Sequence, residues 1–320
     1  MSGESASSSP GGQSSEPSDN SREGAANPTG FQRTWRGLRA HPLAMAGLVV
    51  VSLVTLVGIV TYLDDAFLEN ALIKSVYYSP FDPKFAPLQG PSMAHPFGTD
   101  TLGRDVLART IYGAKVSIQV ALTAVLVAAA LGSPLGVVAG YMGGYVETVV
   151  MRTVDVMLGF PALVLAIGLV AALGFNLTNV IIALGIVYVP QFARIARSTA
   201  LSVSNEEYVD AAKALGYSRP HIVLREVLPN CISPLLVQAS LLMAFAIIAE
   251  ASLSFLGLGV QPPTPTWGQM VSDGSGYLTS APWISVFPGA AIFVTVLGFN
   301  LLGDGLRDAL DPRESAERRF

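Results

Sequence analysis

One acidic residue, Glu250, lies deep inside an apolar run, AIIAEASLSFLGLG, where its chemistry needs an explanation. A charged side chain at the centre of such a run costs about 2.5–3.5 kcal/mol or more unless it is paired or hydrated. Glu250 is therefore a candidate for lining a translocation pathway. It is equally a candidate for a structural hydrogen bond to a neighbouring helix, and both interpretations remain open.

Residues that mark nucleotide, metal or hydrolytic sites do not occur at the required spacing. None of the four lysines lies in a Gly-Lys-Ser/Thr phosphate loop. The three histidines are far apart and form no metal-binding pair, and the single Cys231 excludes an intrachain disulfide or a thiolate cluster. No Gly-x-Ser-x-Gly elbow is present. We therefore expect no catalytic, metal or cofactor site in this chain, and any energy for its work must come from elsewhere.

A polar interval between two apolar runs, Glu206 to Asn230, predicts a short helix suited to contact another protein. Helix-forming residues fill Glu206 to Leu215, and Gly216 ends them, as glycine commonly does just beyond a helix. The small side chains of Ala211 and Ala212 keep the surface low, so that a partner's surface can approach closely. The residues able to share the apolar side of this helix are Val209, Ala212, Ala214 and Leu215.

The same interval carries a motif, which in chain order is Asp210-Ala211-Ala212, Gly216 and Leu228-Pro229. This order resembles the "EAA" loop of ABC-importer permeases, in which Glu-Ala-Ala is followed by Gly and then by Ile-x-Leu-Pro. Asp210 stands in place of the glutamate and keeps its charge, whereas Glu226 stands in place of the isoleucine. The resemblance implies a cytoplasmic coupling loop to an ATPase, formed by Glu207, Asp210, Ala211, Ala212, Gly216, Leu228 and Pro229.

The composition indicates an integral membrane protein. Of the 320 residues, 51% are hydrophobic and only 13% are charged, whereas about a quarter are charged in soluble domains. The mean hydropathy is +0.50. The formal net charge of −4, without a basic run that has interleaved aromatics, argues against a nucleic-acid partner.

Six apolar runs are long enough to cross a bilayer and predict an all-α membrane protein. They lie at about 43–63, 116–138, 154–173, 179–195, 232–256 and 284–302. The first leads into Asp64-Asp65 without a small-residue cleavage site, so we interpret it as a transmembrane helix rather than a signal peptide. Prolines such as Pro161 predict kinks, and glycines such as Gly132, Gly136 and Gly140 predict close helix packing. A helical segment around His221 should end at Leu228-Pro229.

The distribution of positive charge predicts the orientation. With the N-terminus inside, the external segments hold five of the 19 lysines and arginines, Lys74, Lys84, Arg104, Arg109 and Lys115. The long loop from Leu258 to Pro282 has none. This follows the positive-inside rule and places both termini and the 198–230 loop in the cytoplasm.

Several other stretches extend the resemblance to the C-type permease subunit of the oligopeptide, dipeptide and nickel ABC importers. They are HPFGTDTLGRD at 95–105, AGYMGG at 139–144, EASLSFLGLG at 250–259, PPTPTWG at 262–268, APW at 281–283 and FNLLGDGLRD at 299–308. The resemblance implies a permease of the cell membrane, surrounded by lipid, that pairs with a second homologous permease subunit. It further implies two cytoplasmic ABC ATPases that bind the ATP, and an extracytoplasmic substrate-binding protein. The family's substrates are di- and oligopeptides, nickel chelates and some glycans.

We divide the chain accordingly. The expected parts are a disordered tail at 1–29, an N-terminal segment with the first span at 30–63, an external loop and pre-core helix at 64–115, a five-helix core at 116–304 containing the coupling loop 198–230, and a tail at 305–320. The 258–282 loop is stiffened by prolines, and Pro262, Pro263 and Trp267 are candidates for docking the binding protein.

Two other classes of function compete with a permease. A membrane-embedded enzyme would use Glu250, Asp155 or His95, but no two of these are predicted at one depth on facing helices. A passive channel or scaffold would leave the docking helix unexplained.

Overall fold

The computed structural model describes residues 35, 37–68, 71–76 and 78–310. The expected tail at 1–29 and the end of the tail at 305–320 lie outside the described residues. Every regular element in the described part is a helix, which confirms the all-α prediction. The helices are α2 (Pro42–Phe67), α3 (Ala71–Val76), α4 (Val106–Met142), α5 (Gly144–Leu158), α6 (Ala162–Leu173), α7 (Leu177–Ser204), α8 (Glu207–Ala214), α9 (Arg219–Ile222), η1 (Val223–Val227), α10 (Leu228–Phe255), α11 (Trp267–Ser275) and α12 (Trp283–Leu310).

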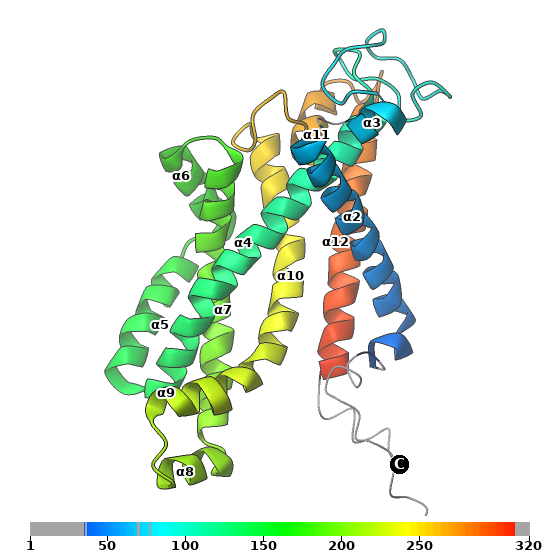
Figure 1. Ribbon diagram of the computed structural model, residues 1–320. Coiled ribbons are helices and arrows are strands. Elements are labelled where there is room, and N and C mark those ends of the chain that lie inside the picture. The colour runs from blue at the N-terminus through cyan, green and yellow to red at the C-terminus, as the bar shows by residue number, and fades with distance from the viewer. Residues whose placement is uncertain (1–34, 36, 69–70, 77, 311–320) are drawn as a thin grey trace, which may run out of the picture.

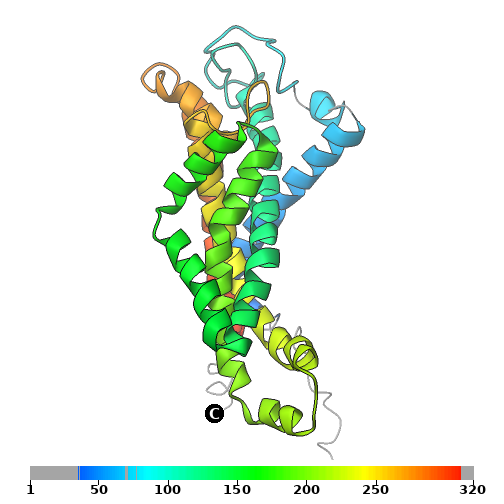
Figure 2. The same cartoon turned by 90° about the vertical axis from the view of Figure 1, so that its left-hand side faces the viewer.

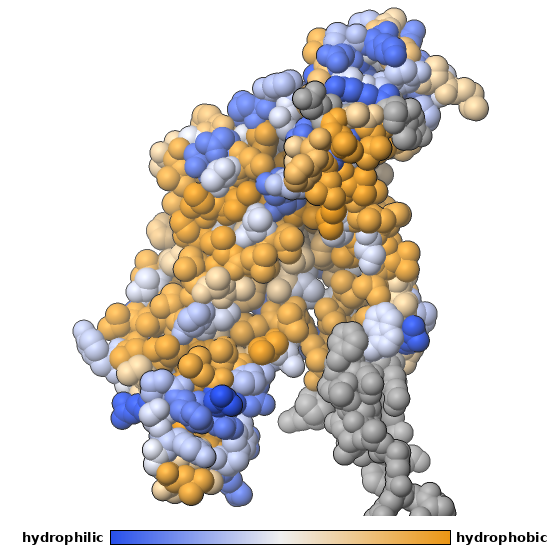
Figure 3. Space-filling view, in the orientation of Figure 1, coloured by the Kyte–Doolittle hydropathy of each residue, from blue (hydrophilic) through white to orange (hydrophobic). Residues whose placement is uncertain are grey.

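The long helices run between two polar ends (Figures 1 and 2). The short helix α8 forms one end, and α11 and the 78–105 segment lie at the other. The face shown in Figure 3 has a broad apolar band between these ends, with hydrophilic surface at both of them. Such a band is what a bilayer requires of a spanning bundle.

Five helices of the described chain are long and apolar enough to cross a membrane, and a bent pair makes up to six. The bent pair is α5 and α6, whose axes differ by 90°. The kink predicted at Pro161 is confirmed, and it divides the span expected at 154–173 into two helices. The chain breaks at Gly159-Phe160-Pro161, because Pro161 has no N–H to continue the hydrogen-bonding of α5 and instead precedes the first turn of α6.

Two further boundaries differ from the sequence-based expectation. Helix α4 begins at Val106 rather than near 116, since the Asp105 carboxylate accepts a hydrogen bond from the Ala108 N–H at 2.8 Å and caps it. The second difference concerns the helical segment around His221. It was expected to stop at Leu228-Pro229 but continues through η1 into α10. Pro229 lies in the first turn of α10, where a missing N–H is tolerated.

The core is centred on the packing of α4 against α7. Gly132, Gly136 and Gly140 form a stripe at four-residue spacing along α4, and the expected close helix packing is confirmed there. A Cβ atom added at Gly132 would lie 2.5 Å from the Val189 carbonyl oxygen, and one at Gly140 would lie 2.5 Å from the Arg197 carbonyl oxygen. The backbones of the two helices therefore touch with no side chain between them.

We predict that Gly136→Ala destabilises the fold, because the added methyl group would lie 2.7 Å from the Ala196 Cβ and against the backbone of α7, which cannot rotate away. Overpacking of this kind costs about 1–3 kcal/mol. The melting temperature in detergent micelles should fall. The matched control is Gly168→Ala in α6, where nothing lies within 4 Å. That variant should be neutral or slightly stabilising, and an equal loss in both variants would contradict the packing argument.

Candidate functional site

Helix α8 has one buried and one exposed side. Val209 and Ala212 are buried at 0% and 5% exposure, in a cluster with residues of α7, η1 and α10. Five exposed positions share one helical face at three- and four-residue spacing, and they are Glu207, Asp210, Ala211, Ala214 and Leu215. Tyr208 and Lys213 are exposed as well. Leu215 is 75% exposed at the end of this face. This exposed face consists of small and acidic side chains, with Leu215 as its one large apolar side chain.

This geometry corrects two expectations. Ala212 packs against its own chain and does not contribute to an outward contact surface, whereas Ala211 does. Leu215 was grouped with Val209 and Ala212 on one side of the helix, but it projects outward while those two residues are buried. The sequence alone did not distinguish the two sides, because alanine fits either environment; the packing of α9 and η1 beneath α8 decides it.

Gly216 ends α8 by backbone geometry. Its φ of +81° lies in the left-handed region, and the Gly216 and Tyr217 N–H groups donate to the carbonyl oxygens of Lys213 and Ala212. This is the Schellman pattern of helix termination. Nothing lies within 4 Å of a Cβ added at Gly216, so within this chain the glycine serves the turn and not a close contact.

Leu228 and Pro229 lie apart from the exposed face of α8. Leu228 is half-buried against the same cluster as Ala212, and Pro229 is exposed on the first turn of α10. Asn230 donates to the Tyr208 hydroxyl at 3.2 Å and so links this turn back to α8. These residues position the short helix.

Glu250 is buried, with 1% exposure, between α10 and α4. Its carboxylate oxygens accept hydrogen bonds from Ser117 on α4 at 3.2 Å and from Ser254 on α10 at 2.7 Å. Ser117 and Ser254 are themselves fully buried. In this conformation Glu250 joins two helices and faces no cavity, which favours the structural interpretation over lining a pathway.

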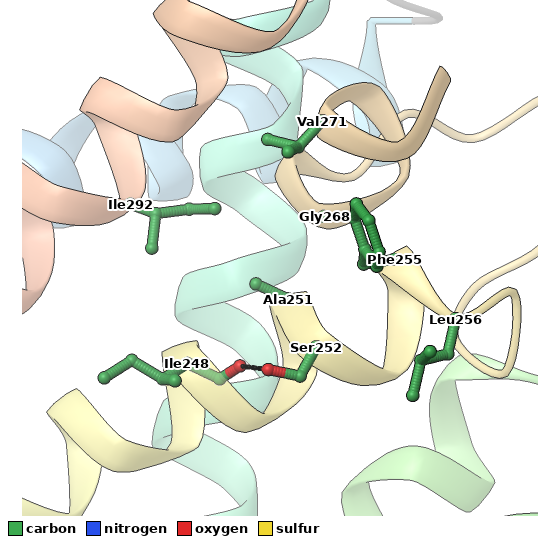
Figure 4. Close-up of a pocket in the computed structure, with 8 residues that line it drawn as sticks. All are labelled: Ile248, Ala251, Ser252, Phe255, Leu256, Gly268, Val271 and Ile292. Atoms are coloured by element: carbon green, nitrogen blue, oxygen red, sulfur yellow. Dashed lines mark hydrogen bonds between the residues drawn. The ribbon is translucent and has the colours of Figure 1, made fainter. Parts of the chain in front are cut away.

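An apolar hollow of about 380 Å³ lies on the other side of this part of α10 (Figure 4). Ile248, Ala251, Ser252 and Phe255 of α10 line it together with Val271 of α11 and Ile292 of α12. The Ser252 hydroxyl donates to the Ile248 carbonyl at 2.7 Å and adds no free polar group. Glu250 does not line the hollow.

Trp267 lies at the start of α11 and is buried, with 2% exposure. Its indole N–H donates to the Thr110 carbonyl oxygen of α4 at 2.8 Å, and the ring packs on Gly113. This corrects the expectation that Trp267 docks a partner, since no free face is left to it. Pro262 and Pro263, by contrast, are exposed in the preceding loop.

Two arginines that the sequence did not single out lie at the α11 end of the bundle. Arg104 and Arg109 are 8% and 3% exposed, and both approach the same Asp100 carboxylate oxygen, at 2.6 and 3.5 Å. Arg109 also donates to the Pro80 carbonyl oxygen at 3.0 Å. Arg104 lies within the HPFGTDTLGRD stretch at 95–105, and Arg109 follows it in the first turn of α4.

Nearby, Asp105 has a buried oxygen, Oδ2, without a hydrogen-bond partner among the described residues. Burial raises the pKa of the Asp105 carboxyl above its ordinary value, opposed by hydrogen bonds from the Ala108 and Leu107 N–H groups. Loss of hydration therefore disfavours the charged form of the Asp105 carboxyl group, which caps α4.

The three groups considered for catalysis are not brought together. Asp155 on α5 pairs with Arg194 on α7 at 2.9 Å. His95 hydrogen-bonds with Ser92 and contacts the Phe85 ring. Glu250 is occupied between α4 and α10. Among the described residues no group of three His, Cys, Asp or Glu could hold a metal ion.

Comparison with known proteins agrees with this geometry. Residues 132–316 match the family described as "Binding-protein-dependent transport system inner membrane component". Residues 29–90 match the "N-terminal TM domain of oligopeptide transport permease C". The chain is 41% identical over 283 residues to a dipeptide transport system permease protein of Alkalihalophilus pseudofirmus, covering 88% of this chain and 90% of that protein.

Other relatives are similarly close. A putative peptide transport system permease protein of Brucella suis is 46% identical over 229 residues, covering 72% of this chain and 77% of that protein. A glutathione transport system permease protein of Shigella flexneri is 43% identical, covering 89% and 91%. Among solved structures, the inward-facing MetNI methionine ABC transporter has a chain with a TM-score of 0.53 and 17% identity, covering 64% of this chain and 97% of that chain. At that identity the likeness shows the fold.

A helical membrane protein with a short, partly exposed helix at one end is thus the class of protein that the fold defines. The chain belongs to the family of inner membrane components of binding-protein-dependent transport systems. It is a permease subunit of an ABC importer, a transport subunit rather than an enzyme, and works with ATPase and substrate-binding partners.

We predict that Trp267 holds α11 to α4. Trp267→Phe should keep most of the packing and lose one hydrogen bond, which costs about 0.5–1.5 kcal/mol. Trp267→Ala should cost about 3–5 kcal/mol through the cavity it leaves. Melting temperatures in detergent should fall in that order. A Trp267→Ala variant as stable as the wild type would contradict the burial of this side chain.

Proposed function

We propose that this chain is one of two homologous transmembrane subunits of an ATP-driven importer of peptides. The observation that carries the proposal is the relationship to permeases named for dipeptides, peptides and glutathione, a tripeptide, over most of the length of each. In this proposal two cytoplasmic ATPases bind the ATP, and a substrate-binding protein delivers the peptide from outside.

The proposal includes an orientation. The α8 end carries exposed or half-buried Arg194, Arg197, Lys213, Arg219 and Arg225. The segment from Leu258 to Pro282, at the opposite end, has no lysine or arginine. This asymmetry supports a cytoplasmic α8 and an extracytoplasmic α11.

The exposed face of α8 is the proposed ATPase contact. A leucine that is 75% exposed on an otherwise polar helix gains free energy when a partner buries it. Asp210 is already paired with Lys213 at 2.9 Å, and an exposed pair of this kind contributes only about 0–1 kcal/mol. Shape and apolar contact should therefore matter more at this interface than the Asp210 charge.

The direct test is uptake by the assembled importer in proteoliposomes. We expect ATP-dependent accumulation of a labelled dipeptide when the permease pair, the ATPases and the binding protein are all present. Neither ATP hydrolysis nor accumulation is expected from this chain alone. Accumulation of nickel chelates or oligosaccharides in place of peptides would reject the substrate class, and ATP hydrolysis by the single chain would reject the division of labour.

The orientation predicts a labelling pattern. Cys231 is buried, so the natural chain should give a low background with an impermeant maleimide. Met93→Cys, at a fully exposed position near the α11 end, should react in spheroplasts. Leu215→Cys on α8 should react only after the membrane is permeabilised, and the reverse pattern would show that the orientation is inverted.

The two neighbouring alanines of α8 give a matched pair for the docking surface. Ala211→Trp adds bulk to the exposed face and should leave the melting temperature unchanged while it abolishes uptake. Ala212→Trp adds the same bulk to the buried cluster and should lower the melting temperature, since overpacking costs about 1–3 kcal/mol. Normal coupled uptake by Ala211→Trp would show that this face does not receive the ATPase.

A further inference from the structure

A polar pocket lies at the α11 end of the bundle, opposite the docking helix. Its volume is about 400 Å³, within the range of small-ligand sites. One wall comes from the start of α4 and the turn before it, and carries Arg104 and Arg109. The other wall comes from α11 and the loop before it, and carries Thr264, Gln269 and Asp273.

The arginine wall has unused hydrogen-bond donors. Arg104 uses its Nε–H to bind Asp100, and Arg109 uses one terminal nitrogen, Nη1, to bind Pro80. The other terminal nitrogens make no hydrogen bond within the described residues, and they are not among the fully buried unpaired atoms. They therefore open to the pocket. Two guanidinium groups share one carboxylate, Asp100, which leaves this wall with excess positive charge.

The opposite wall has an unused acceptor. One oxygen of Asp273 accepts a hydrogen bond from Gln269 at 2.7 Å. The second oxygen makes none among the described residues and is also not buried. Asp273 acts electrostatically on Arg109 across the pocket without an ion pair between them. The pocket is thus neutral overall but polarised, with donors on one wall and a carboxylate on the other.

We propose that this pocket binds the zwitterionic main chain of a short peptide, its carboxylate on the free N–H groups of Arg104 and Arg109 and its amino group on Asp273. A carboxylate is the group that a guanidinium fork binds best. Tyr277 and Leu102 at the rim are both partly exposed and leave room for variable side chains. The inference rests on the proposed uptake of peptides and assigns the site at which the chain first receives one.

Direct binding tests the site without a delivery protein. The assembled importer in lipid nanodiscs, with the binding protein omitted, is titrated with Ala-Phe, N-acetyl-Ala-Phe and Ala-Phe amide by saturation-transfer NMR. We expect Ala-Phe to bind and each capped peptide to bind about tenfold more weakly, the size of one lost charge-assisted hydrogen bond. Equal binding of all three peptides would overturn the proposal.

Variants of each wall sharpen the test. Asp273→Asn keeps the size of the side chain and should abolish the discrimination against the acetylated peptide. Arg104→Lys keeps the charge but loses the fork, and should reduce the discrimination against the amide. The control is Asp82→Asn, which removes an exposed carboxylate at the same end of the bundle but outside the pocket. An equal effect of Asp82→Asn and Asp273→Asn would mean that peptide binding responds only to the overall charge at this end of the bundle. That result would overturn the proposal.

Uptake kinetics separate this site from a docking contact. With liganded binding protein varied, Asp273→Asn should lower the maximal uptake rate and leave the half-saturating concentration unchanged. A raised half-saturating concentration with an unchanged maximal rate would mean that the pocket receives a side chain of the binding protein, which overturns the proposal. If the wild-type importer transports no peptide at all, the proposed function fails. If it transports peptides and Asp273→Asn behaves as the wild type, only the pocket assignment fails.

Discussion

The contact between α4 and α7 is the constraint on which the rest of this subunit depends. At Gly132, Gly136 and Gly140, over about two helical turns, the backbone of α4 lies directly against that of α7. At its start α4 carries the arginine wall of the polar pocket, and at its end α7 leads into the docking helix α8. The two ends of the molecule are thereby fixed to one pair of helices that cannot slide past each other without a steric clash.

The contacts that join α5 and α6 to the α4–α7 pair differ in strength from the contact within that pair. Helix α5 is joined to α7 by the Arg194–Asp155 pair, whose side chains are more than half exposed, and by Arg197 with Glu147. Exposed pairs contribute only about 0–1 kcal/mol, and α5 breaks sharply from α6 just beyond them. The ion pairs of α5 therefore resist displacement less than the backbone contact of α4 with α7 does, whereas α6 is held in the apolar core by the fully buried Ala166 and Val170. The rigid and the adaptable parts of the bundle are separated by the kind of contact each makes.

The sequence predicted those features that depend on local pattern. Apolar runs located the spans, Gly216 was read as a helix end from its residue type, and the glycine stripe predicted close packing. The sequence-based prediction failed where the environment of a side chain depends on which helix packs against it. Whether Ala211 or Ala212 faces outward is decided by the packing of α9 and η1, and whether Trp267 is exposed or buried is decided by α4. The ion-pair partner of Asp155, Arg194, likewise comes from the next helix but one.

Contacts between neighbouring helices also explain why a carboxylate is tolerated at Glu250. Three helices meet near this residue. Glu250 of α10 accepts a hydrogen bond from Ser117 of α4, and Trp267 of α11 donates one to Thr110 of α4. A Cβ atom added at Gly268 would lie 2.7 Å from the Ala251 Cα, so α11 also rests directly on the backbone of α10. Each pair of the three helices is thus fixed by a contact that admits little variation.

That junction joins the two helices that carry the walls of the polar pocket. The arginine wall belongs to α4, and the Asp273 wall belongs to α11, one helical turn beyond Gln269 and close to Trp267 and Gly268. A buried hydrogen-bonded carboxylate holds its neighbours at a defined distance and angle, which an apolar contact of the same size does not. Replacement of Glu250 should therefore change the positions of α4, α10 and α11 relative to one another. The residue that first suggested a transport pathway acts, in this conformation, on the geometry of the helices around it.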